Sequence, residues 1–127
     1  MSNSIFVQSD DKFDVIVYYE IVGKKVTLHD IPPKDCQSLK VTFAYPDYAT
    51  AQRILQLSTK MPSDGGPPVM DFLQMENALL YTLIREWDAK DEKGAPIDVT
   101  NENVSKLRVE IARSLTSRVL REIGPLV

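Results

Sequence analysis

The amino-acid sequence predicts an α+β fold in which a small N-terminal antiparallel β-meander is followed by three α-helices. The period of the apolar residues carries this prediction, because it is near two up to residue 45 and lengthens to three or four beyond Pro46. The length of 127 residues and the hydrophobic content of 43% suit one domain with one core. We therefore expect a single domain over residues 13–127, preceded by a flexible N-terminus at residues 1–12.

Three segments of the N-terminal part, residues 13–45, have the composition of β-strands. Residues 13–21 are rich in β-branched and aromatic side chains, and Gly23 offers a turn into a returning strand at 25–31. Two prolines end that strand, and apolar alternation then predicts a third strand at 39–45. We expect a β-hairpin that the third strand extends into a meander.

The helical part, residues 46–127, begins with a predicted helix at 47–60. Asp47 stands just before its first apolar residue and is a preferred N-cap. The segment 61–68 contains three prolines and two glycines, which end the helix and predict an exposed loop.

Two longer amphipathic segments follow that loop. The first predicts a helix at 69–88 with a wide apolar stripe. The second predicts a helix at 101–123, with Thr100 as its N-cap and Gly124 at its end. A charged loop connects them.

The sequence offers few residues for catalysis or metal binding. His29 is the only histidine and Cys36 the only cysteine, and a Pro-Pro turn separates them, which disfavours a designed nucleophile–base pair. The acidic loop near Gly94 fails the calcium-loop register, because Ala89 and Thr100 fall where Asp and Glu are required. We expect no enzymatic activity, no metal and no cofactor.

The charge and hydropathy of the chain restrict its partners. The formal net charge of −3 disfavours nucleic acid as the main partner. No segment approaches the roughly twenty apolar residues that span a bilayer, and the first residues lack the pattern of a signal peptide. We expect a protein-binding chain without nucleic-acid or membrane partners, and the lone cysteine suits the cytosol.

Candidate partner-binding residues lie on the two longer predicted helices. The apolar stripe at 69–88 is wide enough to contact a partner as well as the core, although core packing is its default interpretation. The last helix is locally basic, which ordinary solvation explains most simply and which docking of an acidic helix would also explain. The candidates are Phe72, Met75, Leu79, Trp87, Arg113 and Arg121.

Three consecutive motifs in the C-terminal half carry a family resemblance. They are Tyr-Thr-Leu-Ile-Arg-Glu-Trp-Asp at 81–88, Asp-Glu-Lys-Gly-Ala-Pro-Ile at 91–97, and Thr-Asn-Glu-Asn-Val at 100–104. An aromatic-ended helix, an Asp-rich Gly-x-Pro loop and a Thr-x-Glu-led helix resemble the tail assembly chaperones of long-tailed bacteriophages. The resemblance covers residues 70–123.

The resemblance implies a non-enzymatic assembly factor that binds the tape-measure protein and helps recruit tail-tube subunits. It also implies a homo-oligomer that works in the host cell cytoplasm and is absent from the mature virion. Two alternatives stay open: a structural head–tail or tail-completion protein of the phage, and a small cytosolic protein-binding regulatory module.

Overall fold

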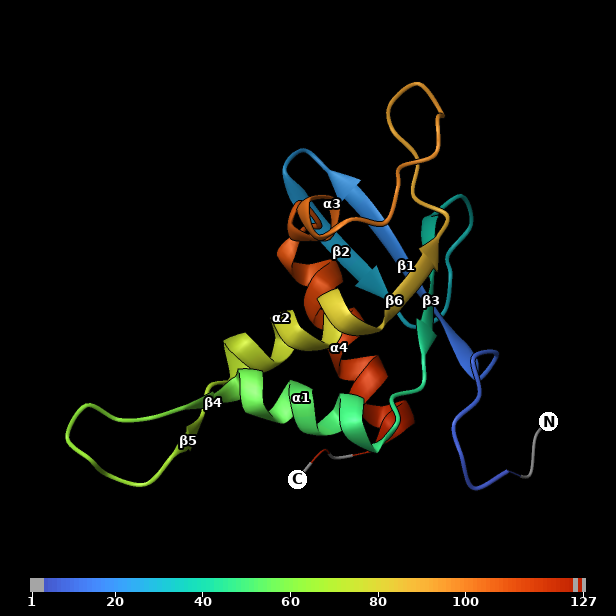
Figure 1. The fold of residues 1–127 in the computed structure, drawn as a ribbon. Helices are drawn as coiled ribbons and strands as arrows, with labels where there is room; N and C mark the ends of the chain where they lie inside the picture. Colours follow the sequence, from blue (N-terminus) through green and yellow to red (C-terminus); the bar gives the residue numbers. More distant parts are fainter. Residues whose placement is uncertain (1–3, 125, 127) are drawn as a thin grey trace.

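Four strands form an antiparallel sheet in the order β2-β1-β3-β6, and helices pack beside it in the computed structural model, which describes residues 4–124 and 126 (Figure 1). The predicted α+β class is confirmed. The sheet strands and the helices are β1 (Lys12–Val22), β2 (Lys25–His29), β3 (Gln37–Ala44), β6 (Ile84–Trp87), α1 (Tyr48–Ser58), α2 (Phe72–Leu83), α3 (Asn101–Ser105) and α4 (Val109–Ile123). A separate short hairpin consists of β4 (Thr59–Lys60) and β5 (Val69–Met70).

The predicted hairpin of β1 and β2 is confirmed. Val22 pairs with Lys25 across a two-residue turn, and Gly23 adopts a φ of 64°, which glycine accepts without steric cost. The third strand departs from the order of a meander, because β3 pairs with the other edge of β1. This register places apolar side chains opposite one another, as in Val15 opposite Val41.

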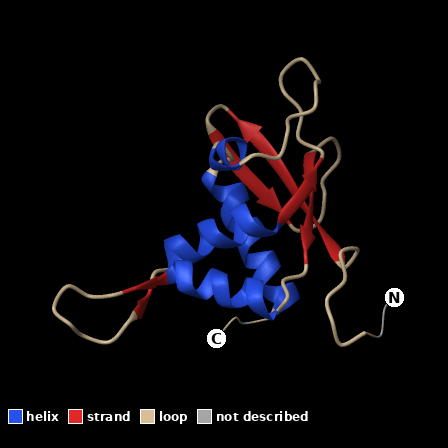
Figure 2. Cartoon of the chain, viewed as in Figure 1, coloured by secondary structure: helices blue, strands red, loops and turns tan. Residues whose placement is uncertain are grey.

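The core lies on the helix-facing side of this sheet. Alternate residues of β1 and β3 point into it. On that side α4 packs against β1 and β2, α2 packs against β6, and α1 packs on α2 (Figure 2). The buried apolar side chains are Val15, Val17, Leu39, Val41, Phe43, Ile54, Ala78, Leu79, Leu80, Leu83, Ile84, Val104, Ile111, Leu115 and Val119.

The helix predicted at 69–88 is wrong at both ends. Residues 69–70 form β5, and after Leu83 the chain becomes extended and pairs with β3 as β6. The pairing contains a bulge, in which Arg85 is the extra residue between the pairs Phe43–Ile84 and Thr42–Glu86. The bulge lets Ile84 and Trp87, three residues apart, both face the core, so a strand displays a spacing typical of a helix.

The helix predicted at 101–123 is divided into α3 and α4. The Lys106 amide closes α3 by donating to carbonyls of that helix, and Arg108 is extended before α4 begins. Val104 and Ile111 are buried on the two sides of the break, and Leu107 within it packs against the core. The apolar spacing therefore continues through the break, and this is why periodicity alone predicts one helix.

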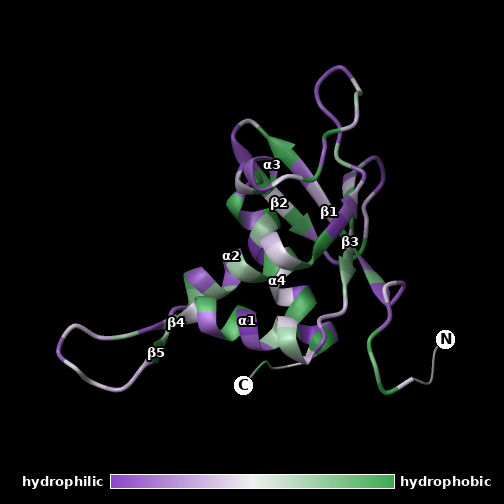
Figure 3. Cartoon of the chain, viewed as in Figure 1, coloured by the Kyte–Doolittle hydropathy of each residue, from purple (hydrophilic) through white to green (hydrophobic). Residues whose placement is uncertain are grey.

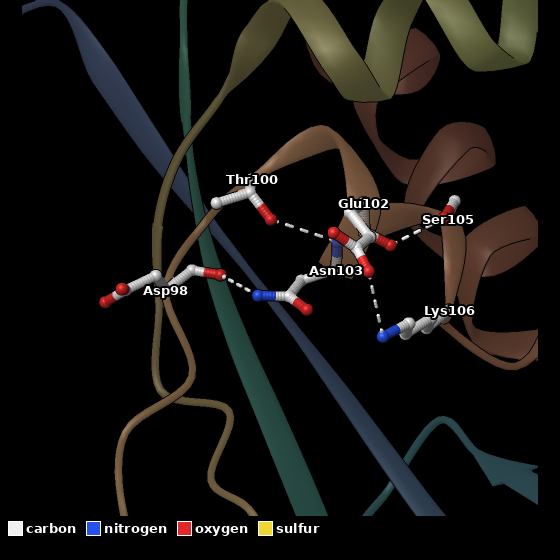
Figure 4. Close-up of polar contacts among 6 residues, drawn as sticks. All are labelled: Asp98, Thr100, Glu102, Asn103, Ser105 and Lys106. Atoms are coloured by element: carbon white, nitrogen blue, oxygen red, sulfur yellow. Dashed lines mark hydrogen bonds and ion pairs between the residues drawn. The ribbon is translucent and has the colours of Figure 1, made fainter.

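The predicted helix caps are confirmed. Asp47 Oδ1 accepts a hydrogen bond from the Thr50 amide at 2.8 Å, and Thr100 Oγ1 accepts from the Asn103 amide at 3.1 Å. Figure 4 shows how the Asn103 side chain continues this network by donating to the Asp98 carbonyl. Asn103 thus joins the start of α3 to Thr100 through its backbone amide and to Asp98 through its side chain.

Replacing Thr100 by alanine is expected to lower the free energy of unfolding by about 1 kcal/mol, because the amide of Asn103 loses its acceptor. Urea unfolding followed by circular dichroism measures this. The control is Ser117→Ala, which also removes a hydroxyl but at an exposed position within α4, and it should be neutral or slightly stabilising since alanine favours helix. Equal losses from both variants would contradict a capping role for Thr100.

Candidate protein-binding surfaces

The structure separates the candidate residues of the apolar stripe. Leu79 is fully buried and Met75 packs against the core, whereas Phe72 is exposed at the start of α2. Leu79 is therefore a core residue and has no surface to offer a partner in the folded state, which corrects its choice as an anchor. The most exposed apolar side chains of α2, Phe72 and Leu73, lie in its first turn.

Trp87 contacts both the sheet and the charged loop that follows it. It lies in β6 opposite Val41, packs partly against the core, and its indole N–H donates a 2.6 Å hydrogen bond to the Ile97 carbonyl. Between these two residues the chain folds back on itself, because Asp91 Oδ1 accepts hydrogen bonds from the amides of Lys93 and Ala95 at 2.8 and 2.9 Å. Trp87 thus ties the charged loop to the sheet.

An exposed apolar cluster lies where α1, the β4–β5 hairpin and α2 meet. We call it the arm-base surface; its members are between 49% and 71% exposed and are Leu57, Met61, Val69, Phe72 and Leu73. Of these residues, only Phe72 is among the candidates predicted from the sequence. Leu57 precedes the Pro/Gly loop at 61–68 and Met61 begins it, so the predicted exposure of that loop was the sequence signal that could have found them.

Backbone and side-chain bonds hold this junction together. Thr59 pairs with Met70, and the Asp71 amide donates to the Ser58 carbonyl at 2.7 Å. Asp71 also caps α2, with Oδ1 accepting from the Leu73 and Gln74 amides. Beyond the junction, residues 61–68 form the predicted loop and project away from the helices as an arm (Figure 1). Strand β5, which follows the arm, is green in Figure 3.

The two candidate arginines lie on the exposed side of α4. Arg113 and Arg121 both line an open groove of about 380 Å³ between α4 and the β1–β2 hairpin. Arg118 lies between them on the same helix and donates from Nη1 to the Ile16 carbonyl at 3.0 Å. The structure therefore brings Arg113 and Arg121 together, but not with the arm-base residues.

Two further titratable side chains, His29 and Tyr45, lie next to carboxylates. His29 Nε2 lies 3.4 Å from a carboxylate oxygen of Glu20. The Tyr45 hydroxyl donates a hydrogen bond to the Glu122 carboxylate, which raises the pKa of Tyr45 to about 12 and joins the chain after β3 to α4. Within residues 4–124 and 126, no group of three or more His, Cys, Asp or Glu side chains is placed to hold a metal ion.

Across the described part of the chain, no helix has the length and apolar character needed to cross a membrane. Comparison with known proteins adds no relative: no family model, curated protein or solved structure matches the chain.

Proposed function

We propose that this chain is a non-enzymatic tail assembly chaperone of a long-tailed bacteriophage. In this role it binds the tape-measure protein and helps recruit tail-tube subunits in the host cell cytoplasm. It acts as a homo-oligomer and is left out of the mature virion. Nucleic acid, membranes and cofactors have no part in the proposal.

The arm-base surface is the observation that carries the proposal. Single exposed apolar residues are ordinary, whereas a contiguous group of them marks a site for another protein. Here five exposed apolar residues lie on the segments α1, β4–β5 and α2 that meet at the base of the projecting arm. An amphipathic client helix would place its apolar face on this surface, and the unbranched side chain of Met61 would adapt to different client residues.

The motifs that carry the family resemblance have recognisable places in the fold. Thr100 caps α3 with Glu102 in its first turn, and the Asp-rich loop closes through the Asp91 hydrogen bonds. Trp87 departs from the pattern, because it ends a strand and not a helix. The loop and the capped helix therefore support the proposal, and the aromatic position does not.

Replacing Phe72 by aspartate is expected to weaken binding of the tape-measure protein from the same phage by about tenfold or more, because a charge would be desolvated in the centre of an apolar contact. Co-expression, affinity capture of this chain and quantification of the bound client measure this. Ile31→Asp is the matched control, since Ile31 is 84% exposed and lies in the segment after β2, outside the arm-base surface. Both variants should keep the melting temperature of the wild type.

Unchanged capture by Phe72→Asp, or equal loss in the Ile31→Asp control, would contradict binding through the arm-base surface. Mass spectrometry of purified mature virions separates the proposal from its nearest rival. A chaperone is absent from them, whereas stoichiometric amounts of the chain would identify a structural head–tail or tail-completion protein.

A further inference from the structure

The groove beside α4 is a second surface with a distinct chemistry. We call it the basic groove; it lies between α4 and the end of the β1–β2 hairpin. Its volume is about 380 Å³, and its lining includes Arg113, Arg118, Arg121, Val17 and Leu28. The arginines and the apolar residues come from parts of the chain some hundred residues apart, as the hydrogen bond from Arg118 to Ile16 illustrates.

The helical period explains why the arginines share one face. The buried stripe of α4 contains Ile111, Leu115 and Val119, each separated by four residues. Positions 113, 117 and 121 repeat with the same spacing but are offset by two residues, about 200°, from that stripe, so they lie on the exposed side of the helix. Arg118 lies between this exposed side and the buried stripe, and the end of the β1–β2 hairpin provides the opposite wall of the groove.

The edge of β1 positions the central arginine. The last pair between β1 and β2 is Tyr18 with His29, so β2 has ended before Ile16. Arg118 Nη1 donates to the Ile16 carbonyl at that place. The bond holds the Arg118 guanidinium at the groove and leaves its other N–H groups for a ligand.

The guanidinium groups of Arg113 and Arg121 can pair with a ligand. In the described residues, no ion pair or hydrogen bond engages Arg113 or Arg121. The acidic side chains lining the groove are Glu110 and Asp30, fewer than its arginines. With three arginines against two carboxylates, the groove has a formal excess of one positive charge on a chain whose net charge is −3.

We propose that the basic groove binds an acidic, partly apolar segment of a partner protein. Carboxylates of the segment would pair with the guanidinium groups, whose planar donors match a carboxylate. An apolar side chain of the segment would pack on Leu28, which is 39% exposed. The exposed apolar side chain of Leu28 beside the arginines favours a peptide, which can carry apolar side chains next to its carboxylates, over a nucleic-acid backbone.

This proposal goes beyond the binding of the tape-measure protein, because it assigns a second surface and does not depend on the client of the first. The test uses the full ¹⁵N-labelled chain and a short synthetic peptide of alternating Glu-Glu and Leu-Leu pairs. Titration followed by NMR should shift the amides of residues 28–30 and 113–121. Binding should weaken from 0.1 M to 1 M NaCl, as the Debye length falls from about 10 Å to about 3 Å.

Charge reversal tests the arginines one at a time. Arg113→Glu and Arg121→Glu should each weaken peptide binding roughly fivefold, the effect of removing one ion pair and adding a repulsion. The matched control is Arg53→Glu, an exposed position on α1 with the same change of charge, and it should leave the affinity within about twofold. Arg118 is left intact because its bond to Ile16 contributes to the fold.

Equal weakening by Arg53→Glu, or shifts spread over amides far from the groove, would overturn the proposal. A single-stranded oligonucleotide or inorganic phosphate that shifts the same amides at lower concentration would also overturn it, in favour of a phosphate site. None of these outcomes affects the capture experiment on Phe72, so the two proposals fail separately.

Discussion

Replacing Leu79 by alanine is expected to lower the free energy of unfolding by roughly 3 kcal/mol, whereas Phe72→Ala in the same helix should change it by less than about 0.5 kcal/mol. Leu79 is fully buried in the core, so truncation loses apolar burial and leaves a cavity that its neighbours fill only in part. Phe72 is exposed and leaves no cavity. Urea unfolding of the two variants measures the difference.

This pair of variants divides the apolar stripe of α2 into core and surface. A loss from Phe72→Ala as large as that from Leu79→Ala would show that Phe72 is covered in solution. A melting temperature that rises with protein concentration would then identify a second copy of the chain as the cover, since association stabilises the folded state by mass action.

The second large effect is expected at Trp87, where truncation to alanine should cost about 3 kcal/mol. The ring is partly buried against the core, and its N–H holds the Ile97 carbonyl, so the variant loses packing and the attachment of the charged loop. Trp87→Phe keeps an aromatic ring without the donor and should cost about 1 kcal/mol. Urea unfolding measures both, and amide exchange at Ile97, which donates to the Ala89 carbonyl, reports the freed loop.

The alternative role for Trp87 is to bind the tape-measure protein as an anchor residue. In that case Trp87→Ala would retain its stability and its protected Ile97 amide, and it would lose capture of the tape-measure protein. The Phe72→Asp variant is expected to show this combination, so the two substitutions provide opposite signatures in the same two assays.

The elements predicted correctly from the sequence depend on neighbours in the chain. The turn at Gly23, the caps at Asp47 and Thr100 and the loop at 61–68 are determined by residues within about four positions of each other. Helix α1 follows for the same reason. Neighbouring residues determine local hydrogen bonds and backbone preferences, so these features can be predicted from the sequence.

Strand β6 could not be predicted in this way. Ile84 and Trp87 are three residues apart, a helical spacing, and only the bulge at Arg85 lets an extended chain bury both. The bulge depends on pairing with β3, more than forty residues earlier in the chain. The free edge of β3 provides hydrogen bonds to an extended chain, and the spacing of apolar residues does not reveal them.

For the candidate surfaces too, the sequence determined some features and the tertiary structure determined others. Apolar and basic periodicity in the sequence determined that Phe72 and Leu79 belong to one amphipathic helix, and that Arg113 and Arg121 share a polar face. Tertiary structure alone decided that Leu79 is core while Phe72 joins Leu57 and Met61 at the surface, and that the arginines face the β1–β2 hairpin. The physical reason is that the period assigns side chains to faces, whereas exposure depends on which distant segment covers each face. Here α1, α4 and β6 pack against α2, and the end of the β1–β2 hairpin lies beside the arginines of α4.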